Sequence, residues 1–300
     1  MLETLRVDAV IREVFDALRT QGMRPILLKG PVIAAWLYEQ PGDRLYVDGD
    51  VMVAPAQLAE SERVLRSLGF TPDHFGLTRD SREWRRGTAQ IDLHTSITGI
   101  GVEPERAWKL LTADTSSAVV GGTTAVEALA EPARALHLAL HVAQHASAVA
   151  KPREDLERAL AMVPQETWEA AATLAEQLDA QPAFTTGLRR VDGGQAVLDR
   201  LRLRPVATPM IVLLEHGAPP GAMGLTQISS ARVRDLPAEI ARAIVPPAAY
   251  MRRVWPGHRP GAAGLAAAHV QRWLRLTLGL PVALSSWRAA RRSAAEPHRP

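Results

Sequence analysis

The stretch RLYVDGDVMV, Arg44 to Val53, carries two aspartates separated by one glycine at the start of an apolar run. In a β-strand, residues two apart point to the same face and lie about 6.5–7 Å apart, so Asp48 and Asp50 would project side by side. Carboxylates so placed repel each other unless a cation lies between them, and hard oxygen ligands suit Mg²⁺ or Mn²⁺. Asp-Gly is also a strong turn signal. The stretch therefore predicts either a pair of metal ligands or a polar turn that enters a strand.

A third carboxylate occurs in the later stretch QIDLHTS, residues 90–96. On a strand, Ile91 and Leu93 would face a core, and Asp92 and His94 would share the polar face. A carboxylate in the middle of an otherwise apolar strand needs a partner. Asp92 is therefore the natural third member of a two-metal site built on Asp48 and Asp50.

The hydrophobic pattern around these residues mixes strands and helices up to about Leu129 and is helical from Pro132 onward. We expect a helix over 2–20, a strand at 26–28 stopped by Gly30 and Pro31, a helix in VIAAWLY, a strand in DVMV, a helix ending at Gly69, and hairpins turning near Arg86-Gly87 and Gly121-Gly122. Within the helical half, ATPMIVLLE is the one strand candidate. The pattern predicts an α+β fold, a mixed sheet flanked by helices and then a mostly helical domain, divided as 1–130 and 131–300.

Composition narrows the classes of function. The 300 residues include no cysteine, which excludes disulfides, thiolate nucleophiles and cysteine-ligated metals. The N-terminus has no uninterrupted apolar segment typical of a secretory signal, so we expect a cytoplasmic protein. Arginines are spread along the chain and the net charge is +3, which does not favour a nucleic-acid surface. Lysine occurs only at Lys29, Lys109 and Lys151, so the lysine before Gly30 is expected for its compact charge.

The C-terminal segment, residues 263–294, is apolar with interspersed arginine and tryptophan. Arg272, Arg275 and Pro281 interrupt it too often for a transmembrane helix, which needs about 20 apolar residues. An amphipathic helix there could lie on an anionic membrane or grip a partner. Packing that closes the helical domain is the commoner use of such a segment, and it is the interpretation we favour.

Four motifs in order resemble a known family. They are ILLKGPVIAAWLY, the R-x-x-x-D-x-D pattern of Arg44 to Asp50, a helix ending in LGF, and IDLH. This order is similar to the uncharacterised nucleotidyltransferases of the DNA polymerase β superfamily. The resemblance runs from about Ile26 to Leu160, because LHLALHVAQH and REDLERAL are similar to the family's later helical segment. It implies a nucleotidyltransferase-like fold.

The resemblance also implies roles for individual residues. Asp48, Asp50 and Asp92 would be the metal ligands and catalytic carboxylates. Lys29 and Gly30 would occupy the turn that cradles the nucleoside triphosphate, and Arg44 would hold the carboxylates or a phosphate. The chemistry agrees, because a glycine lets backbone N–H groups approach phosphate oxygens and an ammonium can neutralise the outer phosphates.

Further residues are candidates for the wall of the cleft. By resemblance, His94 would relay a proton beside the acceptor, although a histidine bonded to a backbone carbonyl fits the pattern equally. His137, His141 and His145 recur every four residues, but no glutamate lies between them as in zinc peptidases, so helix packing or a cleft position at His141 is favoured over zinc. Asp155 could contact that histidine or the nucleotide, or simply be a solvated helix carboxylate.

The chain departs from the family pattern at three places, of which the third is the VMV run after the aspartates. Lys-Gly stands where the superfamily usually has Gly-Ser, which changes the expected phosphate contacts. Gly49 stands where a large aliphatic residue is usual, so we expect a missing core anchor and a looser strand. The residues VMV that follow are conservative in volume.

The reaction implied by the resemblance is transfer of a nucleoside monophosphate from an NTP, with ATP the expected donor and Mg²⁺ or Mn²⁺ the cofactor, to an unidentified small molecule, peptide or protein. Pyrophosphate would leave, and Asp92 would bind metal or take the acceptor's proton. One alternative is a degenerate relative that binds nucleotide or a partner without turnover, which Gly49 indicates. Another is a toxin-like enzyme that modifies RNA, for which the scattered arginines supply no groove.

Overall fold

The computed structural model describes residues 2–40, 42–73, 81–144, 150–205, 207–216, 218–219, 221–230, 233, 236–255, 257–259 and 261–295. The chain forms two compact units, Met1–Pro205 and Val206–Pro300. Each unit has its own elements and its own buried residues, and they are described separately below.

The first unit is built on a seven-stranded sheet in the order β3-β4-β5-β2-β1-β7-β6. Its strands are β1 (Ile26–Leu27), β2 (Gly49–Met52), β3 (Thr71–Asp73), β4 (Ser81–Arg86), β5 (Ala89–His94), β6 (Thr115–Val120) and β7 (Thr124–Leu129). Strand β2 runs parallel to β5 and antiparallel to β1, and β1 runs parallel to β7. The β4–β5 and β6–β7 pairs are antiparallel hairpins, as the Arg-Gly and Gly-Gly turn signals predicted.

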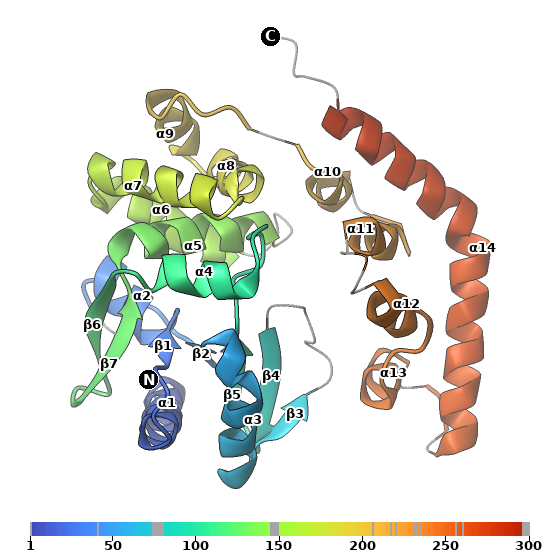
Figure 1. The fold of residues 1–300 in the computed structure, drawn as a ribbon, viewed down its shortest axis with the longest axis horizontal. Coiled ribbons are helices and arrows are strands. Elements are labelled where there is room, and N and C mark those ends of the chain that lie inside the picture. Colours follow the sequence, from blue (N-terminus) through green and yellow to red (C-terminus); the bar gives the residue numbers. More distant parts are fainter. Residues whose placement is uncertain are drawn as a thin grey trace. The chain divides into compact units, whose positions relative to one another are not determined.

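Helices cover both faces of this sheet (Figure 1). They are α1 (Leu2–Thr20), α2 (Pro31–Leu37), the 3₁₀ helix η1 (Pro55–Gln57), α3 (Leu58–Ser67), α4 (Pro104–Leu111), α5 (Glu131–Gln144), α6 (Ala150–Met162), α7 (Gln165–Gln177), α8 (Gln181–Arg189) and α9 (Gly194–Arg200). One buried cluster joins α1 and α3 to the sheet, and the other joins α4–α9 to its opposite face. The sheet is therefore buried on both sides.

The short central strands show how the sequence produces this arrangement. Strand residues alternate between faces, so Leu27 packs into the α1–α3 cluster while Ile26 and Leu28 pack into the other. In β2, Val51 and Met52 divide in the same way. Near-continuous apolar runs such as ILL and VMV are what a sheet covered on both faces requires.

Helix α3 ends at Ser67, and Gly69 is the C′ residue that the sequence predicted. Gly69 follows it with φ of 82°, and the Phe70 N–H donates to the Leu65 carbonyl at 2.9 Å. A left-handed backbone of this kind costs glycine nothing, so the helix stops here and the chain turns into β3.

The second unit is helical in its described residues. Its helices are α10 (Pro209–His216), α11 (Ala222–Ser230), α12 (Leu236–Ile244), α13 (Ala248–Val254) and the long α14 (Ala262–Ala295), against which α10, α11 and α13 pack. The strand considered for ATPMIVLLE is wrong, because this segment forms α10, which packs apolar residues such as Leu213 against α14. None of the described helices is long and apolar enough to cross a membrane.

The predicted fold class is confirmed: a mixed sheet flanked by helices precedes a helical region. The change from sheet to helices falls between β7 and α5, next to the boundary placed at 130/131. The compact units divide later, between Pro205 and Val206, because α5–α9 share a buried cluster with the sheet.

Candidate active site

The centre of the candidate site is a pair of aspartates on neighbouring strands. Strand β2 pairs with β5 in parallel register, which places Asp50 directly beside Asp92. Asp48 lies in a bend immediately before β2, so the Asp-Gly signal marks the turn and Asp50 enters the strand. The sequence offered a polar turn and a pair of strand carboxylates as alternatives, and the structure has a turn at Asp48 and a strand carboxylate at Asp50.

Asp50 has two cationic or polar partners. Lys29 Nζ lies 3.0 Å and His94 Nε2 lies 3.1 Å from the same oxygen, Asp50 Oδ1. Lys29 reaches it because β1 is antiparallel to β2 and the Leu28 N–H donates to the Asp50 carbonyl at 3.0 Å. Burial works to raise the pKa of Asp50, but Lys29 and His94 together hold this pKa well below its usual range. Asp50 is therefore a buried carboxylate that stays ionised.

The charges of the other two carboxylates are compensated less fully. Burial and the nearby charge of Asp50 raise the pKa of Asp92 to about 6, although the Gln90 amide donates to Asp92 Oδ1 at 3.0 Å. Burial and Asp50 also raise the pKa of Asp48, with Lys29 and Lys151 opposing the shift. Carboxylates with pKa values raised by a like charge favour a bound cation.

The donor atoms fit a divalent metal. One ligand atom each from Asp50, Asp92 and His94 can be chosen so that all lie within 4.8 Å of one another. Two carboxylate oxygens suit Mg²⁺ or Mn²⁺, and an imidazole nitrogen shifts the preference toward Mn²⁺. Asp48 is not part of this set of three, so its predicted place as a ligand remains a prediction.

Gly30 forms the turn between β1 and α2. Its φ of 67° and ψ of −117° lie outside the regions that residues with a side chain readily adopt, and it precedes the Pro31 that begins α2. A Cβ at this position would lie 3.5 Å from the Tyr46 ring. The glycine thus lets the backbone after Lys29 turn sharply beside the carboxylates.

A second buried cluster, formed by Arg44, Asp155 and Tyr38, supports the Gly30 turn. Arg44 donates from Nε and Nη2 to the two oxygens of Asp155 at 2.8 and 2.6 Å, and from Nη1 to the Gly30 carbonyl at 3.3 Å. The Tyr38 hydroxyl donates to the same carboxylate at 2.8 Å. Asp155 is fully buried, so it is not a solvated helix carboxylate, and the partners it shows are Arg44 and Tyr38 rather than His141. The guanidinium of Arg44 is directed at Asp155 and the glycine turn, not at the Asp48–Asp50 pair.

The expectation that Gly49 loosens the strand is wrong. A Cβ on Gly49 would lie 2.7 Å from Ile11 Cγ1 and 2.9 Å from Ile91 Cδ1. The isoleucine of α1 fills the space that a larger residue would take, so no core anchor is missing. Because Gly49 has no side chain, α1 can pack closely over β2 at this position.

The histidines of α5 do not form a metal site in the residues that the structure describes. His137 and His141 have ring centroids 6.2 Å apart, and His145 lies outside the described residues. His137 is 4% exposed, its Nδ1 has no hydrogen-bond partner among those residues, and burial and Lys29 lower its pKa to about 3. It is a neutral histidine buried close to the charged cluster.

Three contributors were missed by sequence reasoning as site residues. Lys151 donates to the Leu45 carbonyl and bears electrostatically on Asp48, and its rarity as one of three lysines was a signal that could have found it. Tyr38 and Gln90 gave no signal, because a tyrosine at a helix end and a glutamine on a strand are common in any fold.

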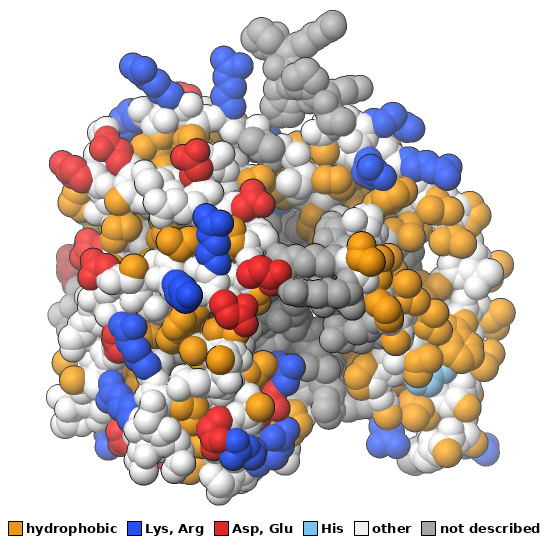
Figure 2. Space-filling view, viewed as in Figure 1, with side chains coloured by type: hydrophobic (Ala, Val, Ile, Leu, Met, Phe, Trp, Pro, Cys, Tyr) orange, Lys and Arg blue, Asp and Glu red, His pale blue; other side chains and the backbone are white. Residues whose placement is uncertain are grey.

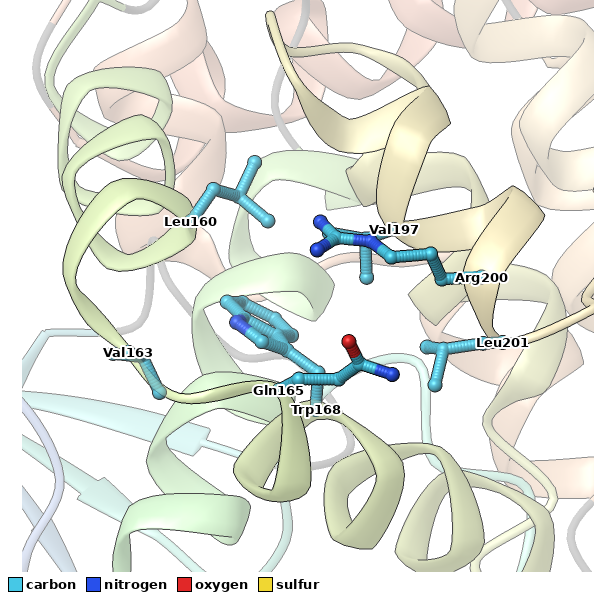
Figure 3. Close-up of a pocket in the computed structure, with 7 residues that line it drawn as sticks. All are labelled: Leu160, Val163, Gln165, Trp168, Val197, Arg200 and Leu201. Carbon is cyan, nitrogen blue, oxygen red and sulfur yellow. The ribbon is translucent and has the colours of Figure 1, made fainter.

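A small pocket lies between α6, α7 and α9, away from the candidate site (Figure 3). None of the candidate site residues lines it; the lining residues are Leu160, Val163, Gln165, Trp168, Val197, Arg200 and Leu201.

Comparison with known proteins identifies the family of the chain. Residues 2–192 match the family model described as uncharacterised nucleotidyltransferase. Among solved structures, the chain is similar to the solution structure of the antibiotic-resistance factor ANT(2'')-Ia, with 15% identity, a TM-score of 0.45, and coverage of 59% of this chain and 95% of that one. No curated protein matches. Because the family model covers most of the chain, as the motifs predicted, this protein belongs to the uncharacterised nucleotidyltransferase family.

Proposed function

We propose that this protein is a metal-dependent nucleotidyltransferase that moves a nucleoside monophosphate from an NTP to an acceptor and releases pyrophosphate. The observation that carries the proposal is the excess of carboxylate at the Asp50–Asp92–His94 cluster, set beside the Lys29–Gly30 turn. Family membership supports nucleotidyl transfer in general. The donor, metal and acceptor are the proposed part.

The metal is proposed to be Mg²⁺ or Mn²⁺, held by Asp50 and Asp92 with His94 as a third donor, and with Asp48 completing the acidic site. When bound, such a cation supplies neutralisation of the triphosphate and of the charge that develops as pyrophosphate leaves. The raised pKa of Asp92 supports this assignment, because a buried carboxylate destabilised by a neighbouring charge gains most from a cation.

Lys29 is proposed to exchange partners during the reaction. In the structure its ammonium pairs with Asp50 at 3.0 Å. A triphosphate on the Gly30 turn offers competing oxygens, so Lys29 would move from the carboxylate to the phosphates and leave Asp50 free to bind metal. Arg44 and Asp155 would keep the turn in place without touching the nucleotide.

Asp92 is the proposed proton acceptor for the attacking hydroxyl when it is not occupied as a ligand. Its pKa of about 6 is close to the working pH that general base catalysis favours. In that alternative His94, which lies on the same strand face, would pass the proton outward instead of binding the metal.

The acceptor is proposed to be a small molecule, peptide or protein, with ATP as the expected donor in the cytoplasm. A degenerate relative is the less favoured alternative, because Ile11 occupies the space beside Gly49 and leaves no gap there. Among the site residues that the structure describes, none specifically favours RNA as acceptor.

The test is calorimetric binding of each NTP with Mg²⁺ or Mn²⁺, together with an assay for pyrophosphate release. We expect metal-dependent binding by the wild type, loss in Asp50→Asn and in Asp48→Ala/Asp50→Ala, and retention in Asp43→Asn. Asp43 is a matched control, because it is an exposed aspartate in the same segment. No binding of any NTP by the folded wild type would contradict the proposal.

The exchange of Lys29 has its own test. Lys29→Met should weaken NTP binding, because one phosphate partner is lost. The same variant should bind Mn²⁺ more tightly in the absence of nucleotide, because the ammonium no longer competes for Asp50. Weakening of both would mean that Lys29 only supports the fold of the site.

A further inference from the structure

The long helix α14 has two different faces. Its buried positions, which include Ala268, Ala283 and Ala290, face the neighbouring helices α10, α11 and α13. On another side, four large apolar side chains at successive i+4 positions are exposed by 50, 58, 80 and 57%; these are Val270, Leu274, Leu278 and Val282. These four residues are called the outer face of α14 below.

An exposed apolar stripe of this length is unusual for a soluble protein and marks a surface that binds something apolar. Hydrophobic side chains gather over α14 in Figure 2, with basic side chains near its ends. Packing inside the helical unit, which the sequence led us to favour, accounts for the small buried residues. It does not account for the outer face.

The charged side chains of α14 itself are all basic. The segment Ala262–Ala295 contains five arginines and no acidic residue, and residues 206–300 contain twelve arginines, four acidic residues and no lysine. Arg288 and Arg292 follow Val270 and Leu274 by five helical turns of about 3.6 residues, so they lie on the same side of the helix. Both arginines are exposed. The two arginines therefore lie beyond the apolar residues, on the side of the helix that carries Val270 and Leu274.

We propose that the outer face of α14 binds the surface of an anionic lipid bilayer, with the helix lying in the plane of the interface. Leucine and valine would enter the boundary between headgroups and acyl chains, and the arginines would contact lipid phosphates. This inference does not depend on the proposed nucleotidyl transfer.

Charge and composition favour lipid over other occupants. A second copy of the chain would bring two purely cationic helices together, which is unfavourable. A nucleic acid would satisfy the arginines but would leave Leu278, 80% exposed, without an apolar partner. A bilayer with anionic headgroups satisfies both kinds of side chain at once.

The test is co-sedimentation of the full chain with vesicles of phosphatidylcholine alone or of equal parts phosphatidylcholine and phosphatidylglycerol. We expect binding to the anionic vesicles only, reduced by added salt. Arg288→Gln/Arg292→Gln should lower the partition coefficient about thirtyfold, and Leu274→Ser/Leu278→Ser by at least about tenfold. Leu5→Ser/Val119→Ser is the matched control, because these residues of the first unit are exposed by 55 and 57%. This control should bind as the wild type does.

Three results would overturn the proposal. One is the absence of binding to anionic vesicles by the folded wild type. Another is equal loss of binding in the control and in the α14 variants. The third is occupation by something else: a dimer that the leucine variant abolishes, or RNA binding that the leucine variant leaves unchanged, in either case without vesicle binding.

Discussion

Two buried charge clusters lie on either side of the Gly30 turn, and they are balanced differently. In the first, the Arg44 guanidinium meets the Asp155 carboxylate through two hydrogen bonds, and Tyr38 adds a third. In the second, Asp48, Asp50 and Asp92 share the nearby ammonium of Lys29 and the His94 ring. The first cluster is satisfied as it stands, whereas the second has more negative charge than its partners neutralise.

The difference indicates what each cluster is for. A balanced buried ion pair holds elements together, and here it ties α6 to the turn that precedes α2. An unbalanced cluster costs stability, and proteins retain such a cost where binding or catalysis uses it. We therefore propose that Arg44–Asp155 positions the turn and that the three carboxylates take part in the proposed reaction.

The largest expected effect comes from breaking the balanced cluster. Asp155→Ala leaves the Arg44 guanidinium buried without its partner, so the free energy of unfolding should fall by about 3–5 kcal/mol. Chemical denaturation measures this, with Asp114→Asn as an exposed control. A loss no larger than that of the control would mean that Arg44 finds other compensation and that the cluster does not hold the turn.

His137 sharpens the comparison through pH. Its pKa of about 3 in the folded chain lies below the ordinary value of 6.5, so the unfolded state binds more protons between these limits. Stability contributed by neutral His137 is fully present above pH 6.5 and is lost as pH falls, by about 2 kcal/mol between pH 6.5 and 5. Denaturation curves of the wild type and His137→Leu should show a smaller acid loss in the variant. Parallel curves would contradict the assignment.

Tyr38 tests whether the third hydrogen bond of the balanced cluster contributes. Tyr38→Phe removes the hydroxyl that donates to Asp155 and keeps the ring, so the free energy of unfolding should fall by about 1.5–2 kcal/mol. In the Asp155→Ala background the same change should cost much less, because the acceptor is absent. Equal losses from Tyr38→Phe in the two backgrounds would show that the hydroxyl acts independently of Asp155.

Asp92 should respond with the opposite sign. Its folded pKa of about 6 exceeds the ordinary 3.8, so the folded state binds more protons between these values and stability falls as pH rises through the folded pKa. Asp92→Asn removes this loss and should stabilise the metal-free chain by on the order of 1 kcal/mol above pH 6, with no gain below pH 4. It should also abolish turnover. Destabilisation at pH 7 would contradict the description of this cluster as unbalanced.

The motifs with a strict geometric requirement could be predicted from the sequence. The D-x-D pair, the IDLH strand and the Lys-Gly turn each need particular residue types at fixed spacing, and the structure brings Lys29, Asp50 and Asp92 together. The hairpin turns and the Gly69 helix end were predictable for the same reason, because a positive φ selects glycine.

Features that depend on contacts between distant segments could not be predicted. Asp155 follows Arg44 by a long stretch of chain, and REDLERAL alone does not distinguish a buried carboxylate from a solvated one. The filling of Gly49 by Ile11 depends on how α1 crosses β2. ATPMIVLLE is apolar throughout, and a short apolar run does not separate a strand from a buried helix.

The central claim is that Asp50, Asp92 and His94 form a metal site that works with a nucleotide, and Mn²⁺ titration followed by electron paramagnetic resonance tests it most directly. We predict saturable Mn²⁺ binding in the presence of ATP, with a nitrogen coupling from His94 that disappears in His94→Gln. Binding should be lost in Asp50→Asn and retained in the exposed control Asp43→Asn. Mn²⁺ that stays free with the wild type, or binds Asp50→Asn equally well, would contradict the claim.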